Sequence, residues 1–203
     1  MDTQSFLEEM NALKDRPDAQ DIENVPAVLE ANRLAWNAST RSQGIKALAQ
    51  LVQQFPASGN ICALYMQALA WDNRVDEALG LASERLDHVT MKSEIASGAG
   101  VINLQLGRLR EAVLWFLRSA AAQGGGHIEN EHLALELSVI FRAVGTRSSN
   151  SSLLAASNEL DRIVAGRIRH SNEGKLSHLA SQADEELVSL MVGAAQQLGW
   201  IPK

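Results

Sequence analysis

The sequence predicts an all-α protein built from antiparallel helix pairs. Three observations predict this class. Hydrophobic residues make up 46% of the 203 residues and charged residues 21%, a balance typical of a folded globular protein. Only four prolines occur, and runs of alternating β-branched residues are nearly absent, which disfavours a sheet. Apolar side chains recur at helical spacing instead, and the pattern itself repeats at an interval of about 34 residues.

The N-terminal stretch, residues 1–24, is expected to cap the array with a short amphipathic helix over residues 4–14. Asp2 or Thr3 can cap the start of this helix, and Pro17 stops it. A helix that leaves this place and docks into a groove of the array is the alternative. The side chains on its apolar face are Phe6, Met10 and Leu13.

The clearest helical stripe begins in "GRLREAVLWF", residues 107–116. The same pattern stands earlier in the chain, where Arg-Val-Asp-Glu-Ala at 74–78 aligns with Arg-Leu-Arg-Glu-Ala at 108–112 without a gap. A weaker third copy lies in residues 41–55, with Gly44 in the alanine position and Pro56 ending the helix. Ser58 or Asn60 can cap the helix that follows. The three apolar stripes are Ile45, Leu48, Val52 and Phe55; Val75, Ala78, Leu79, Ala82 and Leu86; and Leu109, Ala112, Val113, Phe116, Leu117 and Ala120.

Helix pairs of about 34 residues, with small residues near their eighth and twentieth positions, resemble tetratricopeptide repeats. The repeats fall at 25–58, 59–92 and 93–126, about half of the chain. The family's tryptophan at the fourth position is replaced throughout, by Val28, Cys62 and Ala96, so the repeats are degenerate. The resemblance implies a right-handed α-solenoid. The third repeat fits best, with Gly100, Gly107, Leu109, Ala112 and Phe116 in family positions.

Beyond residue 126 the regular spacing of the repeats breaks, although the whole chain is expected to form a single domain. Residues 127–170 are expected to form a distorted fourth helix pair, with a helix at 128–143 and a flexible polar loop at 145–152. Residues 171–203 are expected to form one amphipathic helix that covers the open end of the array. Its apolar residues are Leu176, Leu179, Ala183, Leu187, Leu190, Met191, Ala194 and Leu198, with Gly199 as the C-terminal cap.

The resemblance also implies where a partner binds, because the first helix of each tetratricopeptide pair lines a concave groove. Trp36 and Trp71 fall at nearly equivalent places and are expected to form an aromatic shelf. The alternative is that both fill the core between helices. The groove residues carried over are Arg33, Trp36, Asn37, Asn60, Gln67, Trp71, Glu94, Ser97, Val101 and Gln105, with Leu29, Ala63 and Leu104 at further groove positions.

The expected function is a non-enzymatic scaffold that binds a peptide or a partner protein. The lysine and asparagine with which some family members grip chaperone carboxyl termini are replaced by Ala63 and Gln67, and by Leu29 and Arg33, which argues against that ligand. The alternatives are a secretion-type or assembly chaperone, which predicts a homodimer, and an accessory subunit of a larger enzyme complex. RNA binding is least favoured because the net charge is −6.

The sequence offers little sign of catalytic or metal chemistry. The glycines at 124–126 lack the Lys-Ser/Thr of a phosphate-binding loop and are expected to form a linker. His127, Glu131 and His132 lie near a helix start, where so few potential ligands are more typical of solvated polar side chains than of a metal site. Cys62 lies in an apolar run, which indicates a core residue. No catalytic residue, metal or cofactor is therefore expected.

Two smaller features complete the expectations. Arg162, Arg167, Arg169 and His170 cluster near a helix end, where they complement the helix dipole or form a basic docking patch. The opening "MDTQSFLEEM" is acidic where a signal peptide needs basic residues, and no window approaches eighteen apolar residues. A cytoplasmic protein with no membrane span is expected.

Overall fold

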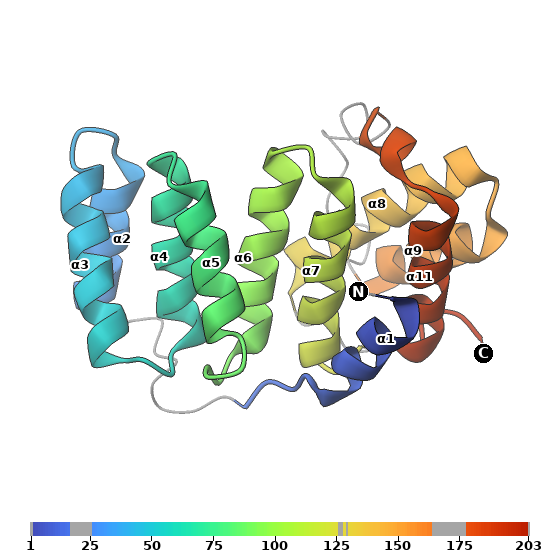
Figure 1. Cartoon of the computed structure of the whole chain (residues 1–203), viewed down its shortest axis with the longest axis horizontal. Coiled ribbons are helices and arrows are strands. Elements are labelled where there is room, and N and C mark those ends of the chain that lie inside the picture. Colours follow the sequence, from blue (N-terminus) through green and yellow to red (C-terminus); the bar gives the residue numbers. More distant parts are fainter. Residues whose placement is uncertain (1, 17–25, 126–127, 129, 164–177, 203) are drawn as a thin grey trace. The chain divides into compact units, whose positions relative to one another are not determined.

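The computed structural model describes residues 2–16, 26–125, 128, 130–163 and 178–202, and every regular element among them is a helix (Figure 1). The prediction of an all-α protein is confirmed. The described elements are α1 (Thr3–Ala12), α2 (Pro26–Trp36), α3 (Arg41–Gln54), α4 (Gly59–Trp71), α5 (Val75–Arg85), α6 (Lys92–Gln105), α7 (Leu109–Ala122), α8 (Glu131–Ser148), α9 (Ser151–Ile163), the 3-10 helix η1 (Ala180–Gln182) and α11 (Glu185–Gln197).

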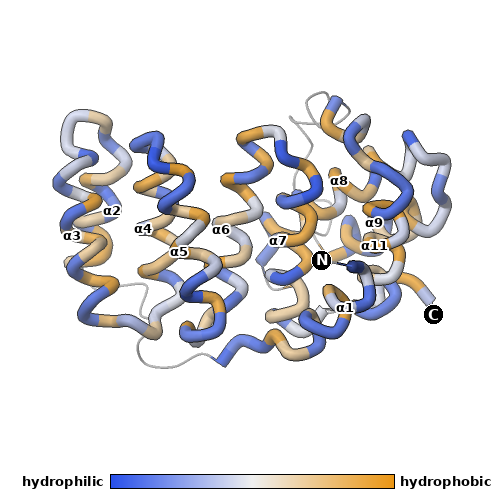
Figure 2. Tube along the Cα trace, in the orientation of Figure 1, coloured by the Kyte–Doolittle hydropathy of each residue, from blue (hydrophilic) through white to orange (hydrophobic). Residues whose placement is uncertain are grey.

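The chain divides into two compact units. The N-terminal unit is Lys14–Ile102, and the C-terminal unit combines Met1–Leu13 with Asn103–Lys203. Figure 2 shows apolar and polar residues alternating along the helices of both units, as amphipathic helices require. The helix pairs α2–α3 and α4–α5 fall within the intervals 25–58 and 59–92 that the repeat pattern predicted, and α6 begins at Lys92, one residue before the predicted third interval.

In the N-terminal unit, consecutive helices pack in pairs through small residues. Gly44 of α3 meets α2 at Ala35, and a Cβ at position 44 would lie 2.3 Å from the backbone nitrogen of Ala35. The equivalent residue of α5 is Ala78, which is fully buried. The first helices of successive pairs also touch: α2 contacts α4, and Gly98 of α6 lies beside Ala63 and Met66 of α4. The helices α2, α4 and α6 therefore lie side by side.

The starts of α4 and α6 are held by hydrogen bonds between loops. Ser58 caps α4 as predicted, because its hydroxyl accepts from the N–H of Ile61 at 3.3 Å. Asp15 accepts at 3.0 Å from the N–H of Ser93 in the first turn of α6. The N–H of Thr90 donates to the carbonyl of Ala57 at 2.9 Å, so the two loops that precede α4 and α6 are joined.

Three helix-to-helix turns share one backbone geometry. At the ends of α4, α6 and α8, a residue in the left-handed region is followed by the residue that directly precedes the next helix. The N–H of Arg74 donates to Leu69, and the N–H of Arg108 donates to Asn103, at 2.9 and 3.0 Å. Both bonds span five residues, as in a Schellman motif. The left-handed residues are Asn73 (φ 63°), Gly107 (φ 72°) and Ser149 (φ 52°).

In the C-terminal unit, α8 and α9 form a pair, and α1 packs against α7 and α11. The link to α7 is Arg118, which donates to Glu9 at 2.7 and 3.0 Å. Its guanidinium lies 5.0 Å from the ring centre of Phe6 and 4.9 Å from that of Trp115. Phe6 is fully buried, and Asp2 caps α1 as predicted. The N-terminal helix expected to cap the array thus packs on helices that are distant from it in the sequence.

Two expectations about the C-terminal half were wrong. Residues 145–152 do not form a flexible loop, because α8 continues to Ser148 and α9 begins at Ser151. Ser149 adopts the left-handed conformation, and the side chain of Asn150 accepts from the N–H of Leu153 at 3.1 Å, so these two residues suffice for the turn. The second error concerns the last helix.

The last helix was expected to run unbroken through residues 176–198. Instead η1 ends at Gln182, and α11 starts after Asp184, whose side chain accepts from the N–H of Leu187 at 2.7 Å. Leu176 and the arginines at 167 and 169, with His170, lie outside the described residues, as do Pro17 and His127. Gly199 ends α11 with φ 79°, as predicted. The predicted apolar residues Leu187, Leu190, Met191, Ala194 and Leu198 are buried.

Candidate partner-binding surface

Two tryptophans in contact form the most distinctive feature of the N-terminal unit. Trp36 is the last residue of α2, and Trp71 is the last residue of α4. Their ring centres lie 4.7 Å apart, and the ring planes are inclined by 54°. Trp36 is 65% exposed, whereas Trp71 is half-buried. The alternative in which both rings fill the core therefore does not describe Trp36.

Arg41, the first residue of α3, bonds to the C-terminal ends of α2 and α4, the helices that carry these two rings. Its Nε donates to the carbonyl of Ala35 at 3.2 Å, and its Nη1 donates to the carbonyl of Trp71 at 2.8 Å. A cation at the C-terminal ends of two helices also complements their dipoles. The spacing of the tryptophans is thereby set by backbone groups as well as by the contact of their rings.

An exposed stripe on α2 leads away from Trp36. Leu29 is 53% exposed and lies two helical turns before Trp36, with Arg33 between them. Arg33 makes a bidentate pair with Glu30, with two nitrogen–oxygen distances of 2.7 Å. The hydrogen bond from Arg33 lowers the pKa of Glu30, and the same bond raises the pKa of Arg33. The charge of Arg33 is thus already matched within the helix.

The same kind of stripe continues on α4 and α6. Each of these two helices is mostly buried but presents half-buried residues at helical spacing. The α4 stripe is Asn60, Leu64, Gln67 and Trp71, and the α6 stripe is Glu94, Ser97 and Val101. Most of the predicted groove residues lie on these two stripes. The accessible residues of the three adjacent first helices are therefore mixed: the two tryptophans, the apolar Leu29, Leu64 and Val101, and the polar Asn60, Gln67, Glu94 and Ser97.

Three other predicted groove residues need separate mention. Ala63 is buried and lies beside Gly98 of α6, so it does not line the surface. Asn37 is exposed, but its Oδ1 accepts from the N–H and the hydroxyl of Ser39 at 3.0 and 2.9 Å, so it shapes the turn between α2 and α3. Gln105 is exposed and belongs to the C-terminal unit.

Sequence reasoning missed one polar atom near this surface. Asn32 lies on α2 one turn before Trp36, and its Oδ1 is buried without a hydrogen-bond partner among the residues that the structure describes. An unpaired buried acceptor costs on the order of 1–3 kcal/mol. The sequence does carry a signal for this atom, because Asn32 is a neutral polar residue in the middle of a helix whose other residues are apolar or charged.

The other sequence candidates have structural roles where they are described. Gly124 and Gly125, with φ 91° and 72°, end α7, and the N–H of Gly125 donates to Ala120 at 2.9 Å. The expected linker is thus a helix cap. Cys62 is buried, as predicted. Glu131 and His132 are exposed, and no group of three or more potential metal ligands occurs among the described residues.

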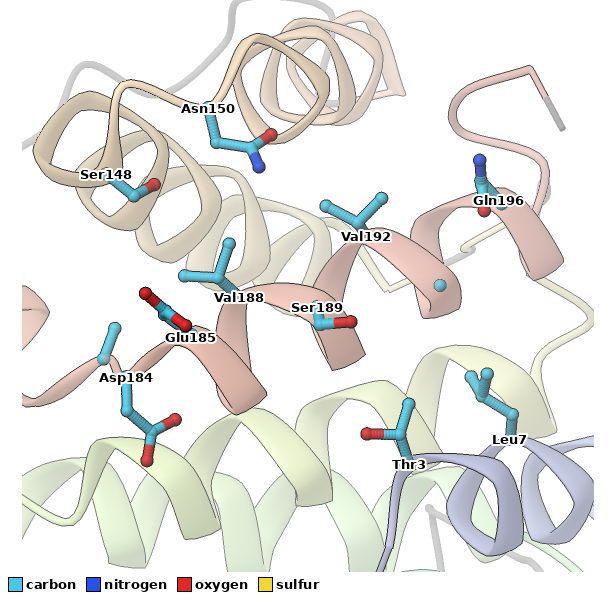
Figure 3. A pocket seen from close by; sticks show the side chains of 12 residues that line it. Thr3, Leu7, Ser148, Asn150, Asp184, Glu185, Val188, Ser189, Val192 and Gln196 are labelled. Carbon is cyan, nitrogen blue, oxygen red and sulfur yellow. The ribbon is translucent and has the colours of Figure 1, made fainter.

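A hollow of about 690 Å³ lies in the C-terminal unit, over the exposed face of α11 (Figure 3). No sequence pattern pointed to it, because its lining comes from α1, α11 and the turn between α8 and α9. Val188 and Val192 form an apolar strip, and Asp184 and Glu185 stand at one end. Asp184 already caps α11 and pairs with Arg110 at 3.5 Å. The lining of the hollow is therefore partly apolar and partly polar, and one of its carboxylates is already bonded within the protein.

Comparisons with protein-family models, with curated proteins and with solved structures found no match. Within the described part of the chain, no helix has both the length and the apolar character needed to cross a bilayer.

Proposed function

We propose that this chain is a non-enzymatic interaction module that binds a peptide or an unfolded segment of a partner protein across α2, α4 and α6. The observation that carries the proposal is the contact of the exposed Trp36 with the half-buried Trp71. A tryptophan that is 65% exposed contributes little to a core, whereas tryptophans are enriched among residues that dominate binding energy. The half-buried stripes of α4 and α6 offer polar groups beside it.

The proposal includes a tetratricopeptide-like architecture, a right-handed α-solenoid. Two features recur at the spacing of the repeats and support it. The turns at Asn73 and Gly107 have similar φ values and the same five-residue hydrogen bonds. The small residues Gly44, Ala78 and Ala112 are all buried at the corresponding place in α3, α5 and α7. One helix pair cannot bury its apolar face alone, so repeated pairs favour stacking.

A display library of random dodecapeptides, selected against the full chain, tests the function. Binding of selected peptides is then measured by isothermal titration calorimetry with the parent, with Trp36→Ala and with Leu106→Ala. Leu106 is 44% exposed and follows α6, outside the stripes, so it is the matched control for an exposed apolar side chain. We expect Trp36→Ala to weaken binding about 30-fold, the effect of a hot-spot residue, and Leu106→Ala to leave it unchanged.

Two results would contradict the proposal. One is that selection yields no peptide that binds the parent. The other is that selected peptides bind the parent and Trp36→Ala equally well, which would place their site elsewhere.

A further inference from the structure

We propose that the Trp36–Trp71 pair, together with the adjacent Asp72, binds a basic side chain, lysine or arginine, of the partner segment. This inference rests on the function proposed above and names the residue that the partner presents to the rings. The ring centres lie 4.7 Å apart and the ring planes are inclined by 54°, so the rings are not stacked flat against each other. The face of a tryptophan ring carries partial negative charge and attracts cations.

Asp72 occupies an unusual place for an acidic residue, because it is the C-cap of α4. The C-terminal end of a helix is the negative end of its dipole, which favours cations and disfavours a carboxylate. The turn that follows α4 does not require an acid, since the similar turn at Gly107 has Leu106 in the corresponding place. Helix capping and turn geometry therefore do not account for a carboxylate next to Trp71, whereas binding of a cation does.

The basic side chains of the neighbouring turns are bonded to other carboxylates. Arg33 pairs with Glu30, and Arg74 pairs with Glu77, each at 2.7 Å. The hydrogen bond to Glu77 is the main reason that the pKa of Arg74 is raised, and the charge of Asp72 contributes less. Neither arginine therefore has Asp72 as its main partner.

The two remaining charges close to the rings offset helix dipoles. Arg41 donates to the carbonyl groups of Ala35 and Trp71 at 3.2 and 2.8 Å, so its positive charge faces the negative ends of α2 and α4. Asp76 lies in the first turn of α5, where it complements the positive end of that helix. Asp72 thus leaves negative charge beside the rings, which favours a cation over an anion or an uncharged side chain.

The C-terminal unit contains the same combination of groups with a cation in place. The guanidinium of Arg118 lies 5.0 Å from the ring centre of Phe6 and 4.9 Å from that of Trp115. It also donates to the carboxylate of Glu9 at 2.7 and 3.0 Å. Two aromatic rings and a carboxylate thus hold one basic side chain in this protein. The proposed site has the same kinds of group, and no cation of the described residues lies over its rings.

Apolar side chains accompany the two tryptophans on the same helix stripes. Leu29 lies two turns before Trp36 on α2 and is 53% exposed. Leu64 lies two turns before Trp71 on α4 and is half-buried. Lysine and arginine themselves pack an apolar stem against such surfaces. The segment that fits therefore has one basic residue flanked by apolar residues, and a run of basic residues does not fit.

Synthetic peptides from the dodecapeptide selection test the inference with the full chain. In each peptide that binds the parent more tightly than Trp36→Ala, every arginine is replaced in turn by citrulline and every lysine by norleucine, which are uncharged. We expect one such replacement to weaken binding about tenfold, by calorimetry. Asp72→Asn should weaken binding of the unmodified peptides about fivefold. Asp76→Asn is the matched control, because it removes the same charge four residues further on, and it should leave binding unchanged.

Asp72→Asn is expected to fold as the parent does, because it removes a carboxylate from the negative end of α4. Urea denaturation establishes this. The inference is overturned, and the proposed function stands, if peptides that depend on Trp36 contain no basic residue or bind equally after its replacement. It is also overturned if Asp72→Asn binds as the parent does, or if Asp76→Asn weakens binding equally. A selection that yields no peptide dependent on Trp36 removes both the inference and the proposed function.

Discussion

Gly44 stands so close to Ala35 that a Cβ at position 44 would lie 2.3 Å from the backbone nitrogen and 2.6 Å from the Cα of Ala35. Backbone atoms cannot move aside as a flexible side chain can. The two later copies of this position hold alanines, Ala78 and Ala112, which are fully buried. The first pair, α2–α3, therefore packs more closely here than a Cβ allows, and the weaker sequence match of the first copy has a structural cause.

Gly44→Ala is expected to destabilise the protein by up to about 2 kcal/mol. Overpacking a close contact costs about 1–3 kcal/mol, and this exceeds the gain of about 1 kcal/mol from replacing glycine by alanine in a helix. Gly80→Ala is the matched control, because nothing lies within 4 Å of a Cβ there. It should stabilise α5 by about 0.5–1 kcal/mol. Urea denaturation measures both, and a stable Gly44→Ala would refute the close packing of α2 on α3.

The turns at Gly107 and Ser149 predict opposite effects of two substitutions. Both residues have positive φ, 72° and 52°. Because a left-handed conformation costs a residue with a Cβ about 1–2 kcal/mol, Gly107→Ala should lower the free energy of unfolding by that amount. Ser149→Gly should raise it by up to about 1 kcal/mol, since the cap from Asn150 is kept. Urea denaturation checks both, and equal effects of the two substitutions would contradict the shared turn geometry.

How far the sequence predicts the structure can be argued from these same residues. Local signals served well: the spacing of the repeats placed Leu109, Ala112 and Phe116 in the core, and Ser58 and Gly199 stand at helix ends as expected. The turn at Ser149–Asn150 was misread because serine and asparagine suit both a flexible loop and a tight cap. Only the helical continuation to Ser148 distinguishes the two, and a polar exposed helix end leaves no apolar pattern.

The contacts that set the candidate site could be predicted only in part. The tryptophans were placed by the repeat register, and their contact follows from it. The bonds of Arg41 to Ala35 and Trp71 could not be foreseen, because one of them joins residues 30 positions apart. The packing of α1 on α7 depends on Glu9 and Arg118, 109 positions apart, and no local pattern specifies such a pair.

Arg118 is expected to hold α1 in place. It is 9% exposed and bonded to Glu9, whose side chain is 32% exposed. Arg118→Met leaves that carboxylate partly buried without its partner, and we expect a loss of about 2–3 kcal/mol. Adding Glu9→Met should restore part of the loss, because no unpaired charge remains. Hydrogen exchange of α1 amides reports the effect, and exchange that stays slow in Arg118→Met would contradict this role.

Glu136 predicts a pH dependence of stability. Burial raises the pKa of its carboxyl above the ordinary 4.5, and the charge of His132, one turn earlier, partly opposes this. The folded state then binds the proton more tightly than the unfolded state. The stability that this proton contributes is therefore fully present below about pH 4.5 and is lost as the pH rises through the folded pKa.

Glu136→Gln should remove this loss, since the amide stays neutral. The variant is expected to gain stability over the parent at pH 7 and to lose that advantage at pH 4. Urea denaturation of both proteins at the two pH values measures it. A difference that is the same at pH 4 and pH 7 would show that Glu136 does not titrate in the proposed way.

Trp36 and Trp71 should differ in what they contribute to stability. Trp36 is 65% exposed and loses mainly its contact with Trp71, so Trp36→Ala should cost about 1 kcal/mol, the energy of an aromatic pair. Trp71→Ala removes a half-buried ring from α4 and should cost more, about 2–3 kcal/mol. The double variant should then cost less than the sum of the two, because both single variants lose the same contact. If urea denaturation showed that Trp36→Ala alone costs about as much as the loss of a core aromatic ring, folding would account for this residue, and the surface proposed for binding would lose its main support.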